Sequence, residues 1–312
     1  MNNYHHEILE IAEDIQFDKI MDHPNILIAA SFWEEDRYRA AKICYKFMRM
    51  IDDLIDNRKA QEEKISCLER QLLSEKVKDW INCLNTVSSD DPFIMELTET
   101  ICRYKIPLQL FHNFAKSMLY DIDHNGFSTF NEFLEYSNGA SVAPASVFVH
   151  LCCLNKISGE YFPAEFDVIE VARPCAIFSY IVHIIRDFQK DQWNNLNYFA
   201  HDILEKYGLN PSHLREIADG GFIPDSFRKM MKEYYVQAQQ YGAQTLMVLD
   251  KISSQVSGRY LLSLQIIYYL YLQVFNRIDI DGGNFTREEL NPTPAEIKHS
   301  VLEVIERYQV LG

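Results

Sequence analysis

Apolar residues recur at steps of three and four through most of the chain, which is the period of an amphipathic α-helix. This pattern predicts helices over the residue ranges 1–22, 34–56, 61–86, 91–103, 107–124, 165–191, 226–253, 257–279 and 294–309. No stretch shows the sustained alternation of apolar and polar residues that marks a β-strand. We therefore expect an all-α protein of about ten to twelve helices, with residues 1–22 as an N-terminal cover.

Two of the predicted helices carry polar groups on one stripe of an otherwise apolar sequence. On the first helix these groups are Tyr45, Arg49, Asp52 and Asp56, and on the second they are Tyr180, His183, Asp187 and Asp191, with Arg186 alongside. An unpaired carboxylate in apolar surroundings is costly and tends to take up a proton. Two acidic pairs, each beside an arginine, therefore indicate a clamp for Mg²⁺ and a diphosphate between facing helices.

Spacing alone does not make that case, because the same Asp-x-x-x-Asp step occurs at Asp14/Asp18 and at Asp18/Asp22. For any single pair the alternative is a solvated helix face. The apolar context and the adjacent arginines distinguish the two chosen pairs.

The amino-acid composition limits which folds and which partners are possible. Apolar residues make up 47% of the chain, and its 11 glycines and 10 prolines do not gather into a linker, so we expect one domain over residues 1–312. A net charge of −15 argues against nucleic acid as a partner, because phosphate binding requires a basic surface. The chain has no apolar run of the ~18 residues that a spanning helix needs. The seven scattered cysteines fit reduced thiols, and we expect a cytoplasmic protein.

A separate candidate lies between residues 121 and 132. The segment from Asp121 to Glu132 resembles an EF-hand calcium loop, with acids at its first and third positions, a glycine at the sixth and a glutamate at the twelfth. Against calcium, Ser128 stands where such loops usually carry an aliphatic residue. The competing interpretation is a helix end, a short loop and a new helix that leads to Tyr136.

Gly139 to Ser146 forms an unusual stretch, in which all residues except Val142 are small or proline. Small side chains allow another helix or a ligand to approach closely, and Pro144 would kink the helix and free backbone carbonyls. These residues are compatible with tight helix packing and equally with a wall that lines a ligand-binding space.

The chain resembles the squalene/phytoene synthases, which join two prenyl diphosphates head to head. The resemblance lies in Tyr45-x-x-x-Arg49-x-x-Asp52-Asp53-x-x-Asp56, in Arg186-Asp187-x-x-x-Asp191, and in the order of the features between and after them, from about residue 23 to about residue 298. It implies an isoprenoid-synthase-type helical bundle with a central cavity. The implied Mg²⁺ ligands are Asp52, Asp56, Asp187 and Asp191, which act in catalysis with Tyr136, and the implied substrate-binding residues are Tyr45, Arg49, Tyr180, His183, Arg186 and Tyr271.

The chain departs from the family pattern on the second acidic helix. Tyr180 and His183 stand where the family has glutamine and asparagine, and Leu196 replaces a basic residue further on. Imidazole is a poor ligand for Mg²⁺. His183 is therefore expected either to be protonated and to bind diphosphate as a cation, or to be a neutral, hydrogen-bonded structural residue.

These observations favour a Mg²⁺-dependent synthase that ionises farnesyl or geranylgeranyl diphosphate and condenses it head to head. One alternative is a cyclase or lyase that ionises a single prenyl diphosphate, and the other is a non-catalytic member of the family. NADPH use rests on the resemblance alone, because no nicotinamide-binding signature is visible. Product release would involve transient contact with a membrane surface.

Overall fold

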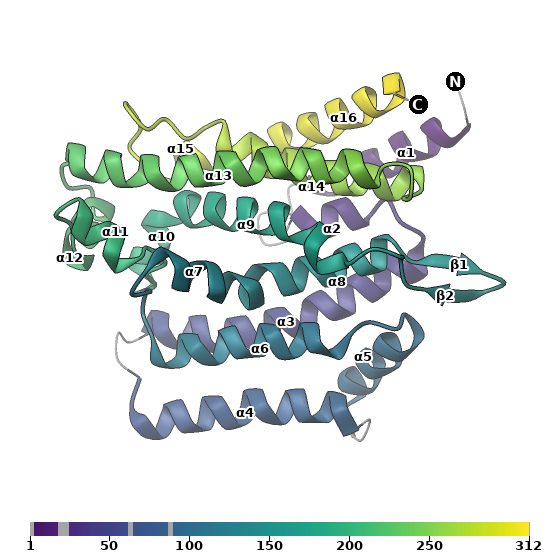
Figure 1. Cartoon of the computed structure of the whole chain (residues 1–312), viewed down its shortest axis with the longest axis horizontal. Helices are drawn as coiled ribbons and strands as arrows, with labels where there is room; N and C mark the ends of the chain where they lie inside the picture. The colour runs from purple at the N-terminus through teal and green to yellow at the C-terminus, as the bar shows by residue number, and fades with distance from the viewer. Residues whose placement is uncertain (1–2, 18–24, 62–64, 87–89, 312) are drawn as a thin grey trace.

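The computed structural model describes residues 3–17, 25–61, 65–86 and 90–311, and the regular structure of these segments is almost entirely helical (Figure 1). In chain order the elements are α1 (Asn3–Asp14), α2 (Asn25–Ala30), α3 (Glu35–Gln61), α4 (Cys67–Thr86), α5 (Pro92–Arg103), α6 (Leu108–Asp123), α7 (Phe130–Ser137), the π-helix η2 (Asn138–Val142), α8 (Ala143–Cys152), β1 (Asn155–Ile157), β2 (Glu160–Phe162), α9 (Val168–Arg186), α10 (Phe188–Trp193), α11 (His201–Lys206), α12 (Pro211–Ala218), α13 (Asp225–Ile252), α14 (Gly258–Phe275), α15 (Arg287–Leu290) and α16 (Pro294–Leu311).

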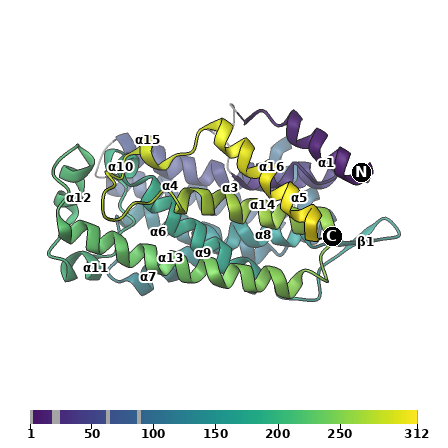
Figure 2. The ribbon, with the colours of Figure 1, turned by 90° about the horizontal axis from the view of Figure 1, so that it is seen from above.

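The helices stack in layers around α9. Figure 1 shows α13 above α9 and α7 with α8 below it, followed by α3 and α6 and then by α4 at the outer edge. Residue contacts join α9 to α13, α8, α14 and η2. From above, α16 crosses over α14 and lies beside α1, so both termini lie on one side of the bundle (Figure 2).

Short polar residues place several helix starts close to the predicted positions. The Asp91 carboxylate accepts a hydrogen bond from the backbone N–H of Phe93 at 2.8 Å, and Thr129 caps α7 through the N–H of Glu132 at 3.2 Å. Such caps satisfy backbone donors that a helix leaves free at its first turn. The predicted all-α fold is confirmed within the described residues.

Three details differ from the prediction. A two-stranded hairpin, β1–β2, interrupts the helical chain, because strands of three residues are too short to show alternation. The predicted helix 165–191 divides at Asp187 into α9 and α10. In the predicted cover, α1 ends at Asp14, and residues 18–22 lie outside the described segments.

The small-residue stretch brings helices close together. A side chain at Gly139 would place its Cβ 2.2 Å from the carbonyl oxygen of Asn113 on α6. The helix widens into η2 just before Pro144, which lacks the N–H needed for a regular α-turn. The predicted close approach at Gly139 is therefore confirmed.

One described helix, α9, is long and apolar enough to cross a membrane by length and composition alone. Half of its most apolar window is buried inside the protein. All seven cysteines lie in described segments, and all of them are free thiols.

Candidate active site

Carboxylates from three helices, partly shielded from solvent, lie near one another. Burial and the charge of Asp56 raise the pKa of Asp52 to about 7, and burial and the charge of Asp121 raise the pKa of Asp56 to about 6. On α10, burial and the charges of Asp187 and Asp56 raise the pKa of Asp191 well above its ordinary value. Because the charge of Asp56 contributes to the raised pKa of Asp191, α3 and α10 bring these two carboxylates near each other.

Asp121 on α6 belongs to the same acidic group. It is buried, and its carboxylate accepts a hydrogen bond from the Tyr136 hydroxyl at 2.5 Å. Burial raises the pKa of Asp121 to about 7, although the nearby Lys59 cation acts to lower it. The Lys59 ammonium group donates a hydrogen bond to the backbone carbonyl of His124 at 2.9 Å. Asp121 and Lys59 were not among the predicted site residues.

The calcium interpretation of residues 121–132 is wrong, because its first three positions lie within α6. Asp121 turns inward to Tyr136, and Asp123 pairs with Arg70 at 3.4 Å. Glu132 accepts a hydrogen bond from the backbone N–H of Ser128 at 2.5 Å and so closes the start of α7. These carboxylates do not converge, which excludes an EF-hand loop.

Aromatic rings cover the acidic group on the side of α7 and α9. The Tyr180 ring stacks on Phe133 with centroids 5.6 Å apart and lies 6.3 Å from the ring of Tyr136. Tyr198 completes the group at 6.1 Å from Tyr180. Burial raises the pKa values of Tyr136, Tyr180 and Tyr198 well above 10, so these hydroxyls stay neutral.

A polar cleft of about 880 Å³ lies against the same helices. It is bounded by α3, by the α9–α10 junction, by α14 and by the segment around α15. Its charged lining consists of Arg39, Lys42, Lys46, Arg49, Arg186, Lys190 and Arg287 against Asp53, Glu96 and Asp187. In a chain with a net charge of −15 this cleft is a local concentration of positive charge, which suits an anionic ligand.

Asp187 faces this basic cleft and is held there by its neighbours. Its two carboxylate oxygens accept hydrogen bonds from Nε and Nη2 of Arg186 at 2.7 and 2.9 Å, and Oδ2 also accepts one from Nε2 of His183 at 2.8 Å. Burial alone would raise the pKa of Asp187, but His183 and Arg186 hold it well below its usual range. Asp187 is therefore ionised in the absence of any metal.

His183 does not behave as the cation that its acidic neighbours suggested. Burial and the Arg186 guanidinium lower the pKa of His183, and they outweigh the attraction of Asp187. At neutral pH Arg186 therefore supplies the positive charge beside Asp187, while a neutral His183 donates through Nε2. The lowered pKa favours the neutral alternative for His183, with the Asp187 carboxylate as its hydrogen-bond partner.

Arg49 connects the acidic group with the cleft. Its Nη1 lies 2.8 Å from Asp52 and its Nη2 lies 2.5 Å from Asp53, while half of its side chain remains exposed. Asp53 directly follows Asp52 in the motif, and this position is the signal that indicates its role. Because Arg49 also lines the cleft, it stands between the carboxylates and any bound anion.

The donor set fits Mg²⁺ when it is shared with phosphate. Within the described part of the chain, no three His, Cys, Asp or Glu side chains form a ready-made metal site. Mg²⁺ usually binds through one or two carboxylates together with the oxygens of a substrate phosphate. The raised pKa values of Asp52, Asp56 and Asp191 show carboxylate charge that a divalent cation would compensate.

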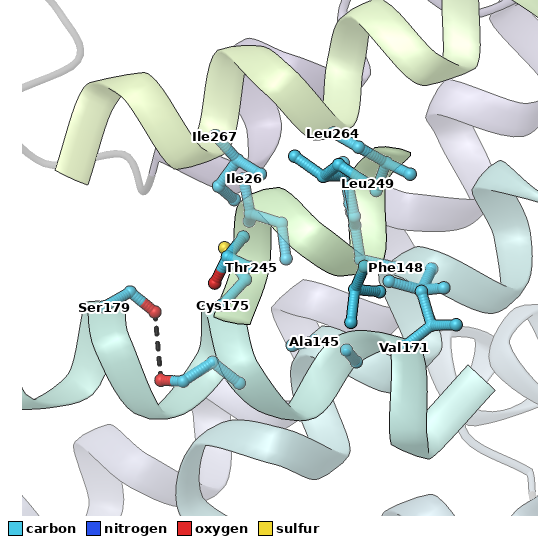
Figure 3. Close-up of a pocket in the computed structure, with 14 residues that line it drawn as sticks. Ile26, Ala145, Phe148, Val171, Cys175, Ser179, Thr245, Leu249, Leu264 and Ile267 are labelled. Carbon is cyan, nitrogen blue, oxygen red and sulfur yellow. Dashed lines mark hydrogen bonds between the residues drawn. The ribbon is translucent and has the colours of Figure 1, made fainter. Parts of the chain in front are cut away.

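Two small apolar cavities lie next to the cleft. The first, of about 30 Å³, shares Leu27 and Tyr45 with the cleft lining. The second, of about 50 Å³, lies between α8, α9, α13 and α14 (Figure 3) and shares Ile26 and Phe148 with the first. Each of the three spaces therefore shares part of its wall with the next.

The second cavity has hydroxyl groups in its wall, but they are already satisfied. Ser179 donates to the carbonyl of Ala176 at 3.0 Å (Figure 3), and Thr245 donates to the carbonyl of Tyr241 at 2.9 Å. With these groups bonded within their own helices, the cavity offers an apolar surface. Such a surface suits a hydrocarbon chain.

The structure separates the predicted site residues into two groups. Asp52, Asp56, Asp191, Tyr136 and Tyr180 belong to the acidic and aromatic interior, whereas Tyr45, Arg49, His183, Arg186, Asp187 and Tyr271 line the cleft. Lys190 and Arg287 also line the cleft and were missed. Leu196, which stands where a basic residue was expected, is buried.

Comparison with known proteins connects this arrangement to one family. The model of the squalene/phytoene synthase family matches residues 23–296. Phytoene synthase 2 of Solanum lycopersicum is 23% identical over 266 residues, which cover 84% of this chain and 79% of that protein. Phytoene synthase of Mycobacterium tuberculosis is 26% identical over 174 residues, covering 56% of this chain and 52% of that protein. The chain spans less than two thirds of several of these relatives, 56% for the Narcissus pseudonarcissus protein.

Solved structures show the same fold at low sequence identity. A ligand complex of a dehydrosqualene synthase superposes with a TM-score of 0.68 at 13% identity, covering 99% of this chain and 97% of that one. The squalene synthase HpnC of Alicyclobacillus acidocaldarius gives a TM-score of 0.55 at 11% identity, covering 90% and 98%. At these identities the likeness concerns the fold alone.

Proposed function

This chain belongs to the squalene/phytoene synthase family, and on that premise we propose that it is a Mg²⁺-dependent transferase. It would ionise a prenyl diphosphate and join two prenyl chains head to head. The observation that carries the proposal is a basic cleft that shares Leu27 and Tyr45 with the wall of an apolar cavity. That combination suits a ligand with an anionic head and an apolar tail.

The cleft would bind the diphosphate. Arg49, Arg186, Lys190 and Arg287 line it, and the planar guanidinium groups suit phosphate oxygens. Asp187 positions Arg186 through two hydrogen bonds, which reduces the freedom that the arginine would lose on binding. Arg49 would exchange some of its contact with Asp52 and Asp53 for the incoming diphosphate.

Asp52, Asp56 and Asp191 would hold Mg²⁺ together with the phosphates, and the metal would neutralise the charge of the leaving diphosphate. The neutral aromatic groups of Phe133, Tyr136 and Tyr180 lie beside these acids. Their faces would stabilise positive charge that develops on the prenyl chain, and their bulk would exclude water.

The test is incubation of the protein with farnesyl or geranylgeranyl diphosphate and Mg²⁺, followed by mass analysis of the products and measurement of diphosphate release. We expect a hydrocarbon with twice the carbon number of the substrate and no turnover in EDTA. Asp52→Asn and Asp191→Asn should each abolish diphosphate release. Unchanged release by both variants would place the chemistry elsewhere.

A second candidate function is ionisation of a single prenyl diphosphate by a cyclase or lyase. It is favoured by one observation, because Tyr180 and His183 differ from the family pattern on the second acidic helix and His183 is occupied with Asp187. Product mass distinguishes the two functions, since a single-substrate enzyme would yield a product with the carbon number of its substrate.

A further inference from the structure

A lysine follows the first acidic pair on the same helix. Asp52, Asp56 and Lys59 succeed one another on α3 at steps of four and three, which puts them on one face of the helix. Lys59 lies beyond the acidic motif, which ends at Asp56. It is nevertheless buried, with only 9% exposed. A lysine is rarely buried to this extent unless its charge is balanced.

The end of α3 holds Lys59 in place. The Arg58 guanidinium pairs with Glu69 on α4 at 2.8 Å, and the side-chain amide of Asn195 donates to the backbone carbonyl of Lys59 at 3.3 Å. The Lys59 ammonium donates in turn to the carbonyl of His124 at 2.9 Å. His124 is the C-cap residue of α6, where the helix dipole favours a positive charge. Lys59 therefore reaches from α3 to the end of α6, its neighbour in Figure 1.

Asp121 lies in the last turn of α6, three residues before His124. It is buried, and its carboxylate accepts the hydrogen bond of the Tyr136 hydroxyl at 2.5 Å. Burial raises the pKa values of Asp121 and Asp56, and the charge of Lys59 acts to lower both. Burial lowers the pKa of Lys59, and the charges of Asp121 and Asp56 oppose that shift. The ammonium and the two carboxylates therefore stabilise one another's charges inside the protein.

Other cations serve the cleft side of the acidic group. Arg49 and Arg186 bind carboxylates next to the cleft, and Lys190 lines it. Within the described part of the chain, Lys59 is the cation whose charge lowers the pKa of Asp121. Lys59 therefore compensates the charge on the α6 side of the acidic group, as a bound metal ion would.

We propose that Lys59 is the built-in counter-ion of Asp121 and keeps divalent metal away from the α6 side of the acidic group. The inference rests on the proposed function in one respect, because it concerns the same Mg²⁺ site. A divalent cation near Asp121 would meet the ammonium charge away from bulk water, where repulsion is strong. Mg²⁺ would then be confined to the three carboxylates proposed as its ligands, and Asp121 would position Tyr136 through their hydrogen bond.

The experiment counts bound Mn²⁺ by electron paramagnetic resonance, with the full chain at pH 8 and no prenyl diphosphate. At this pH the Asp121 carboxyl, with a pKa of about 7, is mostly ionised. Lys59→Met should bind one more Mn²⁺ per chain than the wild type, because Asp121 and Asp56 then lack their counter-ion. Lys59→Arg keeps the charge and should bind as the wild type does. Lys116→Met removes an exposed lysine of α6 as the matched control and should also leave the count unchanged.

Asp121→Asn separates exclusion of the metal from a general effect on the fold. In the wild-type background it should leave the Mn²⁺ count unchanged, because Asp121 holds no metal there. In the Lys59→Met background it should remove the added Mn²⁺. The double variant also serves if Lys59→Met alone fails to fold. Loss of both charges together should then restore folding, with a urea midpoint in EDTA closer to that of the wild type.

Several results would overturn the proposal. They are a Lys59→Met variant that binds no more Mn²⁺ than the wild type, an added ion that persists in the double variant or appears in Lys116→Met, and an Asp121→Asn variant that loses an ion. Failure of both Lys59→Met and the double variant to fold would show that Lys59 is only structural. Turnover of farnesyl diphosphate, measured in parallel, tests the proposed function separately, because the Mn²⁺ counts need no substrate.

Discussion

Asp52 and Asp187 carry the same chemical group in opposite electrostatic situations, and replacing each with asparagine should therefore have opposite effects on stability. Asp52 is a carboxylate whose charge is opposed by burial and by Asp56, which raises its pKa to about 7. Asp187 is a carboxylate whose charge is held by Arg186 and His183. We expect Asp52→Asn to stabilise the metal-free protein and Asp187→Asn to destabilise it.

The magnitudes follow from these shifts. A carboxyl pKa raised from 3.8 to about 7 corresponds to roughly 4 kcal/mol above pH 7, at about 1.4 kcal/mol per pKa unit. Solvent reaches the Asp52 side chain, which is 30% exposed, and the variant loses the Arg49 contact, so we expect a gain of roughly 1–3 kcal/mol. Asp187 is only 10% exposed, and removing its charge beside Arg186 should cost roughly 2–4 kcal/mol.

The assay is urea unfolding in EDTA between pH 4 and pH 8. The Asp52→Asn gain should be largest at pH 8 and should vanish as the pH falls toward the unfolded-state pKa, below which wild-type Asp52 is protonated in both states. The Asp187→Asn loss should persist down to lower pH, because the folded-state pKa of Asp187 lies below the unfolded value. Shifts of the same sign in the two variants would refute the assigned charge states.

Other predictions concern the supports of the site. Tyr136→Phe leaves buried Asp121 without its hydroxyl donor, and urea unfolding at pH 8 should show a loss of about 1–3 kcal/mol; an unchanged midpoint would contradict it. Gly139→Ala drives a Cβ against Asn113 and should cost more than ~3 kcal/mol in thermal or urea unfolding. Equal stability of Gly139→Ala and wild type would show that the helices can separate. Burial lowers the pKa of His150, so the stability of the wild type should fall as the pH drops below about 6.5, whereas His150→Gln should lack this dependence. The same change in urea midpoint between pH 7.5 and pH 5.5 in both proteins would refute this expectation.

Much of the fold could be predicted because its rules are local. The start of α5 follows Asp91, whose side chain caps the first turn, and the stripe on α3 follows from helical spacing. The division at Asp187 could not be predicted, because hydrogen bonds of helical spacing continue through it. The Asp187 N–H bonds the carbonyl of His183 at 2.9 Å, and the Asp191 N–H bonds that of Asp187 at 2.8 Å. Only a local change in backbone angle ends α9 there.

The positive charge of the cleft comes from residues that are far apart in the sequence, and for that reason it could not be predicted in full. Leu196 stands where the family pattern has a basic residue, which by itself would weaken an anion site. Arg287 enters the cleft from the segment after α14, where its backbone N–H lies 3.4 Å from the side-chain oxygen of Gln189 on α10. Two residues 98 positions apart meet only in the folded chain. No spacing rule connects them.

The π-helix η2 has a consequence for how a chain of this kind can change in length. A π-turn contains one residue more than the α-turn that it replaces, so it can absorb a single insertion or deletion as local rewinding. Loss of one residue between Asn138 and Val142 would convert the π-turn into an ordinary α-turn and leave the residues of α8 on their present faces. Phe148 would then still line the cavity. One-residue length changes, which usually break a packed helix, could here be taken up within η2 and leave the rest of the bundle in place.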